Sequence, residues 1–327
     1  MAEDARILEI NGLTVRFPTS EGVVRAVDGV SLSLDRGETL GVVGESGCGK
    51  SVMLNSIMRL LEAPPARIGG EILYNGQDIL KMPKRELFRI RGKEITMIFQ
   101  EPMTSLNPVI KIGPQIAETM LLHELITKDE ASAKALELLR QVEIPNAEEC
   151  LGKYPHQLSG GMRQRVMIAM ALACKPQILL ADEPTTALDV TIQAQILALL
   201  RKLKDEYHMS MMIVTHDLGV IAEVSERVVV FYGGNVVEEA PTRALFDTPL
   251  HPYTEGLLGC IPHLSTKTGR LRVIEGNVPN PIDLPEGCVF APRCPRRERL
   301  CVEERPALKE VGDAQGGKRH RVACHMA

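Results

Sequence analysis

The residues most able to do chemistry lie in one glycine-rich stretch, "GVVGESGCGKSV", at positions 41–52. Its spacing is G-x-x-x-x-G-K-S, and it stands between an apolar run and a helix-forming run. Glycines let successive backbone N–H groups point inward as an anion nest, and the helix N-terminus adds partial positive charge. The lysine of such a loop reaches the β- and γ-phosphates of a nucleotide, and the serine ligates Mg²⁺. We therefore predict that ATP and Mg²⁺ are bound by Gly44, Glu45, Ser46, Gly47, Cys48, Gly49, Lys50 and Ser51.

Further polar side chains stand at the ends of apolar runs of strand type. Asp182 and Glu183 end "ILLADE", His216 follows "MMIVT", and Gln100 closes "ITMIFQ". A carboxylate at the carboxyl end of a strand suits Mg²⁺ held mostly through water, which assigns Asp182 to Mg²⁺. Glu183 is expected to act as general base for the attacking water, a role typically worth about 10²–10⁴ in rate. His216 is expected to contact the γ-phosphate, and the Gln100 amide to contact Mg²⁺ or the water.

A second helix start of the anion-binding type occurs in "QLSGGMRQR" at residues 157–165. Ser159 is an N-cap candidate, Gly160 and Gly161 follow it, and a helix is expected from Met162. This nest has no associated lysine. The economical interpretation is that it completes an ATP site on another subunit, so that two chains sandwich two nucleotides.

The elements that must position these groups alternate between strand and helix patterns. Because apolar residues are consecutive there, buried strands are expected at 39–44, 95–100, 178–183, 211–217 and 227–234. Helices are expected at 50–61, 112–123, 129–142, 161–174, 191–206 and 217–223. The alternation predicts an α/β fold with a parallel sheet, in which residues 109–160 form an inserted helical subdomain. Pro, Gly and Arg increase towards the C-terminus, which predicts a boundary between domains 1–258 and 259–327.

Composition narrows the class of protein. The chain has 327 residues, is 44% hydrophobic and 24% charged, and carries a formal net charge of −4, which suits one large domain with an extra module. No apolar run approaches the ~18 residues that span a bilayer, and the acidic start does not resemble a signal peptide. We therefore expect a cytosolic location, which disfavours disulfides. With no Trp and 3% aromatic residues, a base-stacking platform and a nucleic-acid partner are not expected.

Four cysteines gather near the C-terminus with the spacing Cys288-x5-Cys294-x6-Cys301-x22-Cys324. Zinc sites commonly use closer cysteine pairs. A cubane cluster tolerates varied spacing, and Cys294-Pro295 is similar to the Cys-Pro found at some cluster ligands. Spacing alone leaves three readings open: a [4Fe–4S] cluster, zinc with His320 or His325 as substitute ligands, and buried thiols without metal. The remaining cysteines, Cys48 in the phosphate loop among them, are interpreted as packing residues.

Taken together, the motifs resemble the nucleotide-binding subunits of ABC transporters over about residues 1–250. They are the phosphate loop, Gln100, "LSGGMRQR", "ILLADE", "TALD" at 186–189, and His216. The resemblance implies a P-loop NTPase core with antiparallel β and α-helical subdomains, and ATP hydrolysis. It assigns Phe17 to adenine stacking, Ser159 and Gly161 to the γ-phosphate of the partner's nucleotide, and Asp189 to communication between the two sites. Thr186 stands where serine is usual, and this departure removes no catalytic group.

Other segments resemble the dipeptide/oligopeptide importer subfamily, and its D-type ATPase subunits in particular. They are "EPMTSLNPV" (101–109), "YPHQLSGGM", "HPYTEGLL" (251–258) and "GCVFAPRCP". This resemblance implies a second, related ATPase chain, two membrane permeases docking near residues 100–112, and an extracytoplasmic peptide-binding protein. It implies a peripheral position on the cytoplasmic face of the bacterial inner membrane. It also implies a [4Fe–4S] cluster on Cys288, Cys294, Cys301 and Cys324.

Two alternatives remain open at this point. The first is the same engine with another cargo, because nickel and glutathione systems use similar ATPases. The second is a soluble ABC ATPase that acts on nucleic acid or ribosomes. Such proteins usually carry two ATPase units or a long coiled-coil insertion, and the sequence shows neither.

Overall fold

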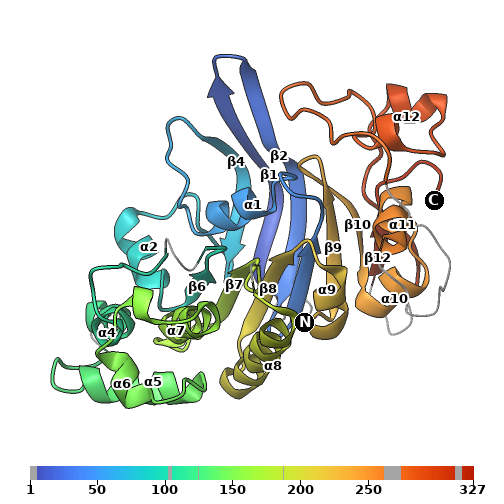
Figure 1. Cartoon of the computed structure of the whole chain (residues 1–327). Coiled ribbons are helices and arrows are strands. Elements are labelled where there is room, and N and C mark those ends of the chain that lie inside the picture. Colours follow the sequence, from blue (N-terminus) through green and yellow to red (C-terminus); the bar gives the residue numbers. More distant parts are fainter. Residues whose placement is uncertain (1–5, 102–104, 124, 187, 261–273, 314–318) are drawn as a thin grey trace. The chain divides into compact units, whose positions relative to one another are not determined.

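The computed structural model describes residues 6–101, 105–123, 125–186, 188–260, 274–313 and 319–327 (Figure 1). The chain divides into two compact units. The first comprises Met1–Asp35, Thr39–Leu80 and Val214–Ala327, and the second comprises Arg36–Glu38 and Lys81–Ile213. The phosphate loop and the cysteine-rich tail therefore belong to the first unit. The acid pair 182–183 and the second nest belong to the second unit.

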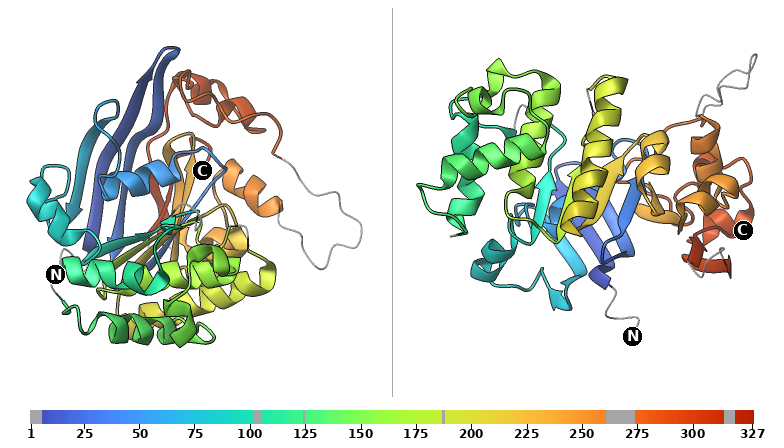
Figure 2. Two further views of the ribbon diagram at one scale, coloured as in Figure 1. Left: turned by 60° about the vertical axis from the view of Figure 1, so that its left-hand side comes forward. Right: turned by 90° about the horizontal axis from the view of Figure 1, so that it is seen from below.

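An antiparallel sheet in the order β2-β1-β4-β5 opens the first unit. Its strands are β1 (Arg6–Thr19), β2 (Gly22–Asp35), β4 (Arg67–Tyr74) and β5 (Gln77–Asp78). Figure 2 shows β1 and β2 as the long blue pair, and their register closes where Thr19 faces Gly22. Leu8, Ile10 and Leu13 of β1 are fully buried. Patterns in the sequence did not mark these strands individually; only the family resemblance implied an antiparallel β subdomain.

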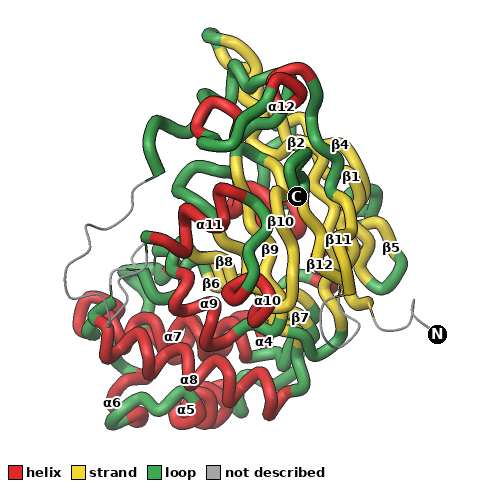
Figure 3. The backbone as a smooth tube through the Cα atoms, turned by 90° about the vertical axis from the view of Figure 1, so that its right-hand side faces the viewer, coloured by secondary structure: helices red, strands yellow, loops and turns green. Residues whose placement is uncertain are grey.

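A second group of strands in the first unit carries the phosphate loop. In the order β11-β12-β10-β9-β3, it contains β11 (Lys309–Asp313), β12 (Arg319–Val322), β10 (Asn235–Pro241), β9 (Arg227–Tyr232) and β3 (Thr39–Val43). β3 and β9 are parallel, whereas β10 is antiparallel to both β9 and β12. Figure 3 shows β10, β12 and β11 side by side. A strand from the C-terminal tail thus extends the sheet that carries the phosphate loop.

The helices of the first unit flank these strands. They are α1 (Lys50–Ile57), α9 (Leu218–Val224), α10 (Thr242–Asp247), α11 (Pro252–Gly259), the short η3 (Ala291–Arg293) and α12 (Arg299–Glu303). α1 begins directly after the phosphate loop, so its N-terminal N–H groups face that loop. η3 stands immediately before Cys294, and α12 contains Cys301.

The second unit combines short buried strands with most of the long helices. Its strands run in the order β8-β7-β6, with β6 (Ile95–Ile98), β7 (Ile178–Asp182) and β8 (Ser210–Thr215), which continues into the first unit. β6 and β7 are parallel, and Ile95 faces Ile178. The helices are α2 (Lys84–Ile90), α4 (Ile112–Leu122), α5 (Ala131–Gln141), α6 (Ala147–Leu151), η2 (Pro155–Gln157), α7 (Gly160–Leu172) and α8 (Val190–Tyr207).

The core of the second unit follows from helical periodicity. In α8 the buried residues Ile196, Leu199, Leu200 and Leu203 recur at the i, i+3, i+4, i+7 spacing of one helix face. α4, α5 and α7 contribute Ile116, Leu139 and Val166, which are all fully buried. Removing such apolar surface from water stabilises the fold by about 25 cal/mol per Å². This core fixes the ends of β6 and β7, where the predicted catalytic side chains stand.

Each of the five strands and six helices expected from the residue pattern is present. The parallel pairing of β3 with β9, and of β6 with β7, confirms the predicted α/β arrangement. Several ends differ. The helix expected from Met162 begins at Gly160, the helix expected to reach residue 61 ends at Ile57, and the strand expected to reach Gln100 ends at Ile98. In the described part of 109–160 the regular elements are helices. The domain boundary after residue 258 stays a prediction.

Among the described residues, no helix combines the length and the apolar character that crossing a membrane requires.

Candidate nucleotide-binding site

The phosphate loop connects β3 to α1 and has room for glycine only at its two critical positions. A Cβ atom on Gly44 would lie 2.3 Å from the carbonyl oxygen of Phe231. Gly49 has φ +104°, and a Cβ atom there would lie 2.1 Å from the carbonyl oxygen of Ala26. The loop therefore packs directly on the backbone of its neighbours. This close packing fixes the directions of the loop's N–H groups.

Lys50 is the buried cation of this loop, with 4% of its surface exposed. Its Nζ atom donates hydrogen bonds to the carbonyl oxygens of Gly44 at 2.7 Å and Glu45 at 2.9 Å. The charge thus lies inside the loop, where it can meet the phosphates of a nucleotide. The structure brings the predicted phosphate-binding residues together in one loop at a helix N-terminus.

Cys48 is buried next to Lys50, and its Sγ atom accepts a hydrogen bond from Nζ at 3.4 Å. Burial raises the pKa of the Cys48 thiol above its ordinary value, and the charge of Lys50 only partly offsets this effect. The thiol is therefore protonated at neutral pH. This agrees with its interpretation as a packing residue.

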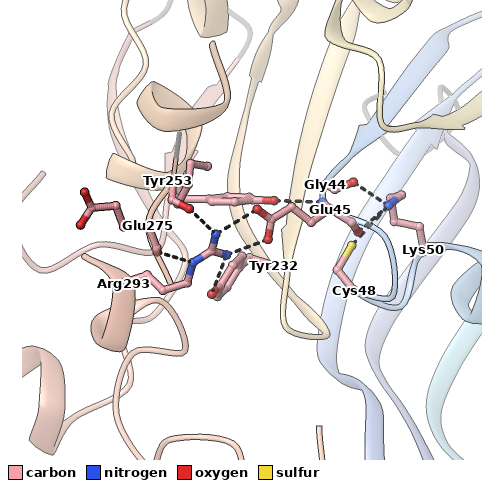
Figure 4. A network of polar contacts seen from close by, with 9 residues as sticks. Gly44, Glu45, Cys48, Lys50, Tyr232, Tyr253, Glu275 and Arg293 are labelled. Atoms are coloured by element: carbon pink, nitrogen blue, oxygen red, sulfur yellow. Dashed lines mark hydrogen bonds and ion pairs between the residues drawn. The ribbon is translucent and has the colours of Figure 1, made fainter. Parts of the chain in front are cut away.

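Three contacts hold the phosphate loop from outside. The N–H of Gly234, in the turn between β9 and β10, donates to the carbonyl of Cys48 at 3.0 Å. The hydroxyl of Tyr253 in α11 accepts from the N–H of Glu45 at 3.0 Å. The Nη1 and Nη2 atoms of Arg293 donate hydrogen bonds to the two carboxylate oxygens of Glu45, at 2.7 and 3.1 Å (Figure 4). Neither Tyr253 nor Arg293 was among the residues predicted from sequence.

In the second unit, Gln100 and Glu183 meet just beyond the ends of β6 and β7. The Nε2 atom of Gln100 donates to Oε2 of Glu183 at 3.0 Å, and the Thr186 hydroxyl donates to the same oxygen at 2.8 Å. Glu183 has φ +46°, in the left-handed region that non-glycine residues rarely occupy. Strained backbone of this kind concentrates at functional sites. The arrangement holds one half-buried carboxylate in a defined orientation.

The other predicted site residues lie in strands or directly after one. Asp182, the last residue of β7, is 4% exposed. His216 follows β8 directly, in the first unit, and is exposed. Phe17 lies in β1, faces Val24 of β2 and is half-buried. The structure thus places Asp182 and Phe17 within strands, and His216 directly after one.

Ser159 and Asp189 are the N-caps of two helices in the second unit. The Ser159 hydroxyl accepts from the N–H of Met162 at 3.3 Å, and the Asp189 carboxylate accepts from the N–H of Ile192 at 2.9 Å. Gly160 and Gly161 form the first turn of α7. The predicted N-cap role of Ser159 is confirmed. Ala187, inside the motif that ends at Asp189, lies outside the described residues, as do residues 102–104.

Comparison with known proteins identifies the family. Residues 27–186 match the family described as "ABC transporter", and residues 237–301 match "Oligopeptide/dipeptide transporter, C-terminal region". The oligopeptide transport ATP-binding protein AppD of Bacillus subtilis is 50% identical over 303 residues, which cover 92% of each chain. OppD of Salmonella typhimurium is 48% identical over 300 residues, which cover 92% of this chain and 89% of OppD. The chain belongs to the ATP-binding subunits of ABC transporters.

Solved structures of ABC cassettes support the same assignment. A dimeric bacterial ABC transporter cassette matches with a TM-score of 0.65 and 32% identity, over 72% of this chain and 99% of that one. The same cassette in a post-hydrolysis state with ADP and phosphate gives the same values. The predicted ABC fold and the prediction of an ABC ATPase are confirmed. The second family match, at residues 237–301, places this ABC subunit beside the oligopeptide and dipeptide transporters.

Three of the four tail cysteines of this ABC subunit have thiols in a buried environment. Burial raises the pKa of the thiols of Cys288, Cys294 and Cys324 above its ordinary value. The N–H of Met326 donates to Sγ of Cys324 at 3.4 Å. As they lie, however, the described residues include no group of three His, Cys, Asp or Glu side chains that could hold a metal ion. The described residues therefore do not support the predicted [4Fe–4S] cluster as they lie.

Sequence reasoning missed Tyr253, Arg293 and the hydrogen bond from Thr186. "HPYTEGLL" entered only as a family marker, and Thr186 only as a departure from the usual serine. One signal was available: Glu45 is an acidic residue inside a loop that must bind phosphates. Such a charge favours a nearby cation. The sequence alone could not show that this cation is Arg293, which lies 248 residues further along the chain.

Proposed function

We propose that this chain is an ATP-hydrolysing subunit that powers peptide import through a heteromeric ABC transporter. The observation that carries the proposal is the match of residues 237–301 to the oligopeptide/dipeptide transporter C-terminal region. The relatives AppD and OppD are named as oligopeptide transport ATP-binding proteins. A loop with its phosphate-binding groups already in place supports the same activity.

The residue roles that we propose come from the sequence motifs, and contacts within each unit support them. Lys50 and the N–H groups of the loop would bind the phosphates, and Glu183 would take a proton from the attacking water. Gln100 and Thr186 orient that carboxylate by hydrogen bonds. Sequence motifs assign Ser51 of the first unit, and Asp182 and Gln100 of the second, each to Mg²⁺, which when bound neutralises charge on the β- and γ-phosphates. A buried carboxylate with oxygen and amide donors is the ligand chemistry that Mg²⁺ prefers.

The nest at the start of α7 supports a two-chain nucleotide site. Ser159 and Gly161 offer a hydroxyl and N–H groups at a helix N-terminus but no lysine, so they suit a phosphate already held by another chain. Asp189 would relay between the two sites, Phe17 would stack on adenine, and His216 would contact the γ-phosphate. The partner would be a second, related ATPase subunit. ATP then favours the closed pair by its differential affinity for that state.

Exposed apolar residues support docking to membrane permeases. Phe99, Val109 and Ile110 are 42%, 79% and 40% exposed, and they lie in or beside the segment predicted to receive the permeases. Burying such side chains against a partner is favourable. We infer that two permease subunits dock here, which places the chain on the cytoplasmic face of the inner membrane. An extracytoplasmic peptide-binding protein would deliver the cargo.

The four tail cysteines would hold a [4Fe–4S] cluster. The N–H groups of Phe290 and Ala291 support this, because they hydrogen-bond to the Cys288 thiol, although burial dominates and raises the pKa of that thiol. Such bonds stabilise thiolate charge in cluster sites. Anaerobic purification with iron and zinc analysis tests the proposal. A brown, iron-loaded protein that becomes colourless in Cys288→Ser is expected; a zinc-loaded or metal-free chain contradicts it.

Co-expression with the products of the neighbouring genes tests the proposed function. We expect a stable complex with two permeases and a second ATPase, whose hydrolysis is stimulated by peptide and the binding protein in liposomes. Stimulation by nickel or glutathione instead would keep the engine and change the cargo. Isolation with ribosomes or nucleic acid, without permeases, would overturn the transporter assignment.

A further inference from the structure

The phosphate loop of this protein carries one acidic residue, Glu45. Its carboxylate is 27% exposed. A negative charge in a loop that binds phosphates repels the ligand, and this repulsion is strong near a partly buried site where water screens poorly. Some other group must therefore compensate for the charge of Glu45 when nucleotide binds.

Arg293 provides this compensation from the C-terminal segment. Its guanidinium forms two parallel hydrogen bonds with the Glu45 carboxylate, Nη1 to Oε2 at 2.7 Å and Nη2 to Oε1 at 3.1 Å. The Arg293 side chain is 5% exposed. Paired bonds between a planar guanidinium and a carboxylate are stronger and more directional than a single contact. The Arg293–Glu45 ion pair is thus bidentate and largely buried on its arginine side, unlike an exposed surface ion pair.

The surroundings of Arg293 fix its orientation. Its Nε and Nη2 atoms donate to the carbonyl oxygens of Glu275 and Ile274, at 3.0 and 3.1 Å. Its guanidinium carbon lies 5.7 Å from the ring centre of Tyr232, over the ring. Nearly all of its donors therefore have partners, so moving it away from Glu45 would break several contacts together (Figure 4).

An aromatic cluster joins Arg293 to the second contact on Glu45. The rings of Tyr232 and Tyr253 lie 4.6 Å apart, and Phe290, three residues before Arg293, lies 5.1 Å from Tyr232 and 5.4 Å from Tyr253. The fully buried Tyr253 accepts the N–H of Glu45 at 3.0 Å. Glu45 is therefore fixed at both its backbone and its side chain by one rigid cluster.

We propose that Arg293 is a positioning residue for nucleotide binding: it neutralises Glu45 and, with Tyr253, holds the phosphate loop ready for its ligand. A loop already in its bound conformation binds without the cost of ordering it. Cys294 follows Arg293 directly, so the cysteine-bearing segment sets the ATP affinity of the loop. This inference deepens the proposed function and rests on the phosphate loop being the nucleotide site.

ATP affinity of the full-length chain, measured with a fluorescent ATP analogue, tests the proposal. Arg293→Gln leaves the Glu45 charge uncompensated, and we expect the Kd for ATP to rise at least about tenfold. Glu45→Gln removes both repulsion and pairing and should change the Kd less. The double variant should therefore bind more tightly than Arg293→Gln alone. A merely structural role predicts no such rescue.

Salt dependence gives a second readout that folding defects would not imitate. Raised ionic strength screens the uncompensated charge of Glu45, so Arg293→Gln should recover affinity relative to the wild type. Arg296→Gln is the matched control, because Arg296 lies in the same segment and forms a bidentate pair at 2.9 and 2.6 Å with Glu255, which belongs to α11 and not to the phosphate loop. Its Kd should stay within about twofold of the wild type.

Three results would overturn the proposal: an unchanged Kd in Arg293→Gln, a double variant that binds no better than that single variant, or an equal loss in Arg296→Gln. If Arg293→Gln does not fold, Arg293→Lys keeps the charge and loses the paired geometry. Its Kd should then lie above the wild-type value and fall when Glu45→Gln is added; an unchanged Kd rejects the proposal. A wild-type chain that bound no ATP would reject the nucleotide site itself, which is a separate failure.

Discussion

The Nε2 atom of Gln100 donates a hydrogen bond of 3.0 Å to the Oε2 atom of Glu183, from the end of one parallel strand to the end of the next. Parallel strands end at the same edge of their sheet, so residues far apart in sequence meet there. Thr186 donates to the same oxygen. A carboxylate held in this way is positioned to accept a proton from water with little reorganisation.

Replacing this carboxylate separates nucleotide binding from hydrolysis. Glu183→Gln keeps the shape of the side chain and removes its basicity, so ATP should bind at wild-type affinity while hydrolysis falls by about 10²–10⁴. Phosphate release by the assembled transporter, with a parallel ATP-binding measurement, checks this. Thr186→Val removes one orienting bond and should lower hydrolysis by only about tenfold. Hydrolysis by Glu183→Gln at a rate close to that of Thr186→Val would exclude Glu183 as the base.

Gly49 is required by the shape of the phosphate loop. Gly49→Ala would set a Cβ atom 2.1 Å from the Ala26 carbonyl oxygen at φ +104°. We expect loss of ATP binding and a fall in the free energy of unfolding on the order of 3 kcal/mol. Gly29→Ala is the matched control, because φ is +82° there with nothing within 4 Å of the Cβ position. It should show only the backbone strain, about 1–2 kcal/mol. Chemical denaturation with equal losses in both variants would contradict the steric argument.

Local patterns predicted the parallel strands and the helices around the site because those signals are short in range. Consecutive apolar residues mark β7, and glycine spacing marks the phosphate loop. The pattern gave no warning that β12 of the tail pairs with β10, since antiparallel pairing between distant segments leaves no local periodicity. The strand predicted over residues 95–100 is longer than β6, because the prediction includes the polar residue Gln100, which follows the strand.

Roles that depend on tertiary contacts could not be predicted from the sequence. Glu183 could be named as a base from its position after "ILLAD", but its orientation by Gln100 and Thr186 required the fold. The compensation of Glu45 by Arg293 joins residues 248 apart and has no motif of its own. Conversely, Ser159 was predictable as an N-cap because capping is a contact between residues three apart.

Ser159 caps α7 in the structure and is proposed to contact the partner's nucleotide, and one pair of variants can separate these two roles. Ser159→Asp keeps an excellent N-cap acceptor for Met162, so stability should stay within about 0.5 kcal/mol of the wild type. Its negative charge would face the partner's γ-phosphate, so ATP-dependent pairing of the two ATPase subunits should be lost. Ser159→Ala loses the cap, about 1 kcal/mol, and weakens pairing less. Sedimentation in the Glu183→Gln background checks both. ATP-dependent pairing of Ser159→Asp at wild-type strength would remove this residue from the interface.

The buried side chain of His251 makes the stability of the protein depend on pH. It is 1% exposed, and its Nδ1 atom accepts the N–H of Tyr253 at 3.1 Å, so the neutral ring carries its proton on Nε2. Burial lowers the pKa of His251 from 6.5 to about 4, although the nearby Glu238 carboxylate opposes this. Below its ordinary pKa the unfolded chain binds a proton that the folded chain does not, so the free energy of unfolding falls with falling pH.

The size of this effect can be isolated with one substitution. From about pH 7 to about pH 5, His251 should lower the free energy of unfolding by about 2 kcal/mol. His251→Asn keeps a side-chain acceptor for the N–H of Tyr253 and has no titrating group, so its unfolding free energy should fall less over this range. Burial opposes ionisation of Glu238, but hydrogen bonds from His320 and two backbone N–H groups together hold its pKa below the ordinary value. Its contribution to stability is therefore lost at lower pH, and it interferes little. Urea unfolding at both pH values measures this difference. An equal loss of unfolding free energy in the wild type and in His251→Asn would mean that His251 is protonated in the folded state at the lower pH.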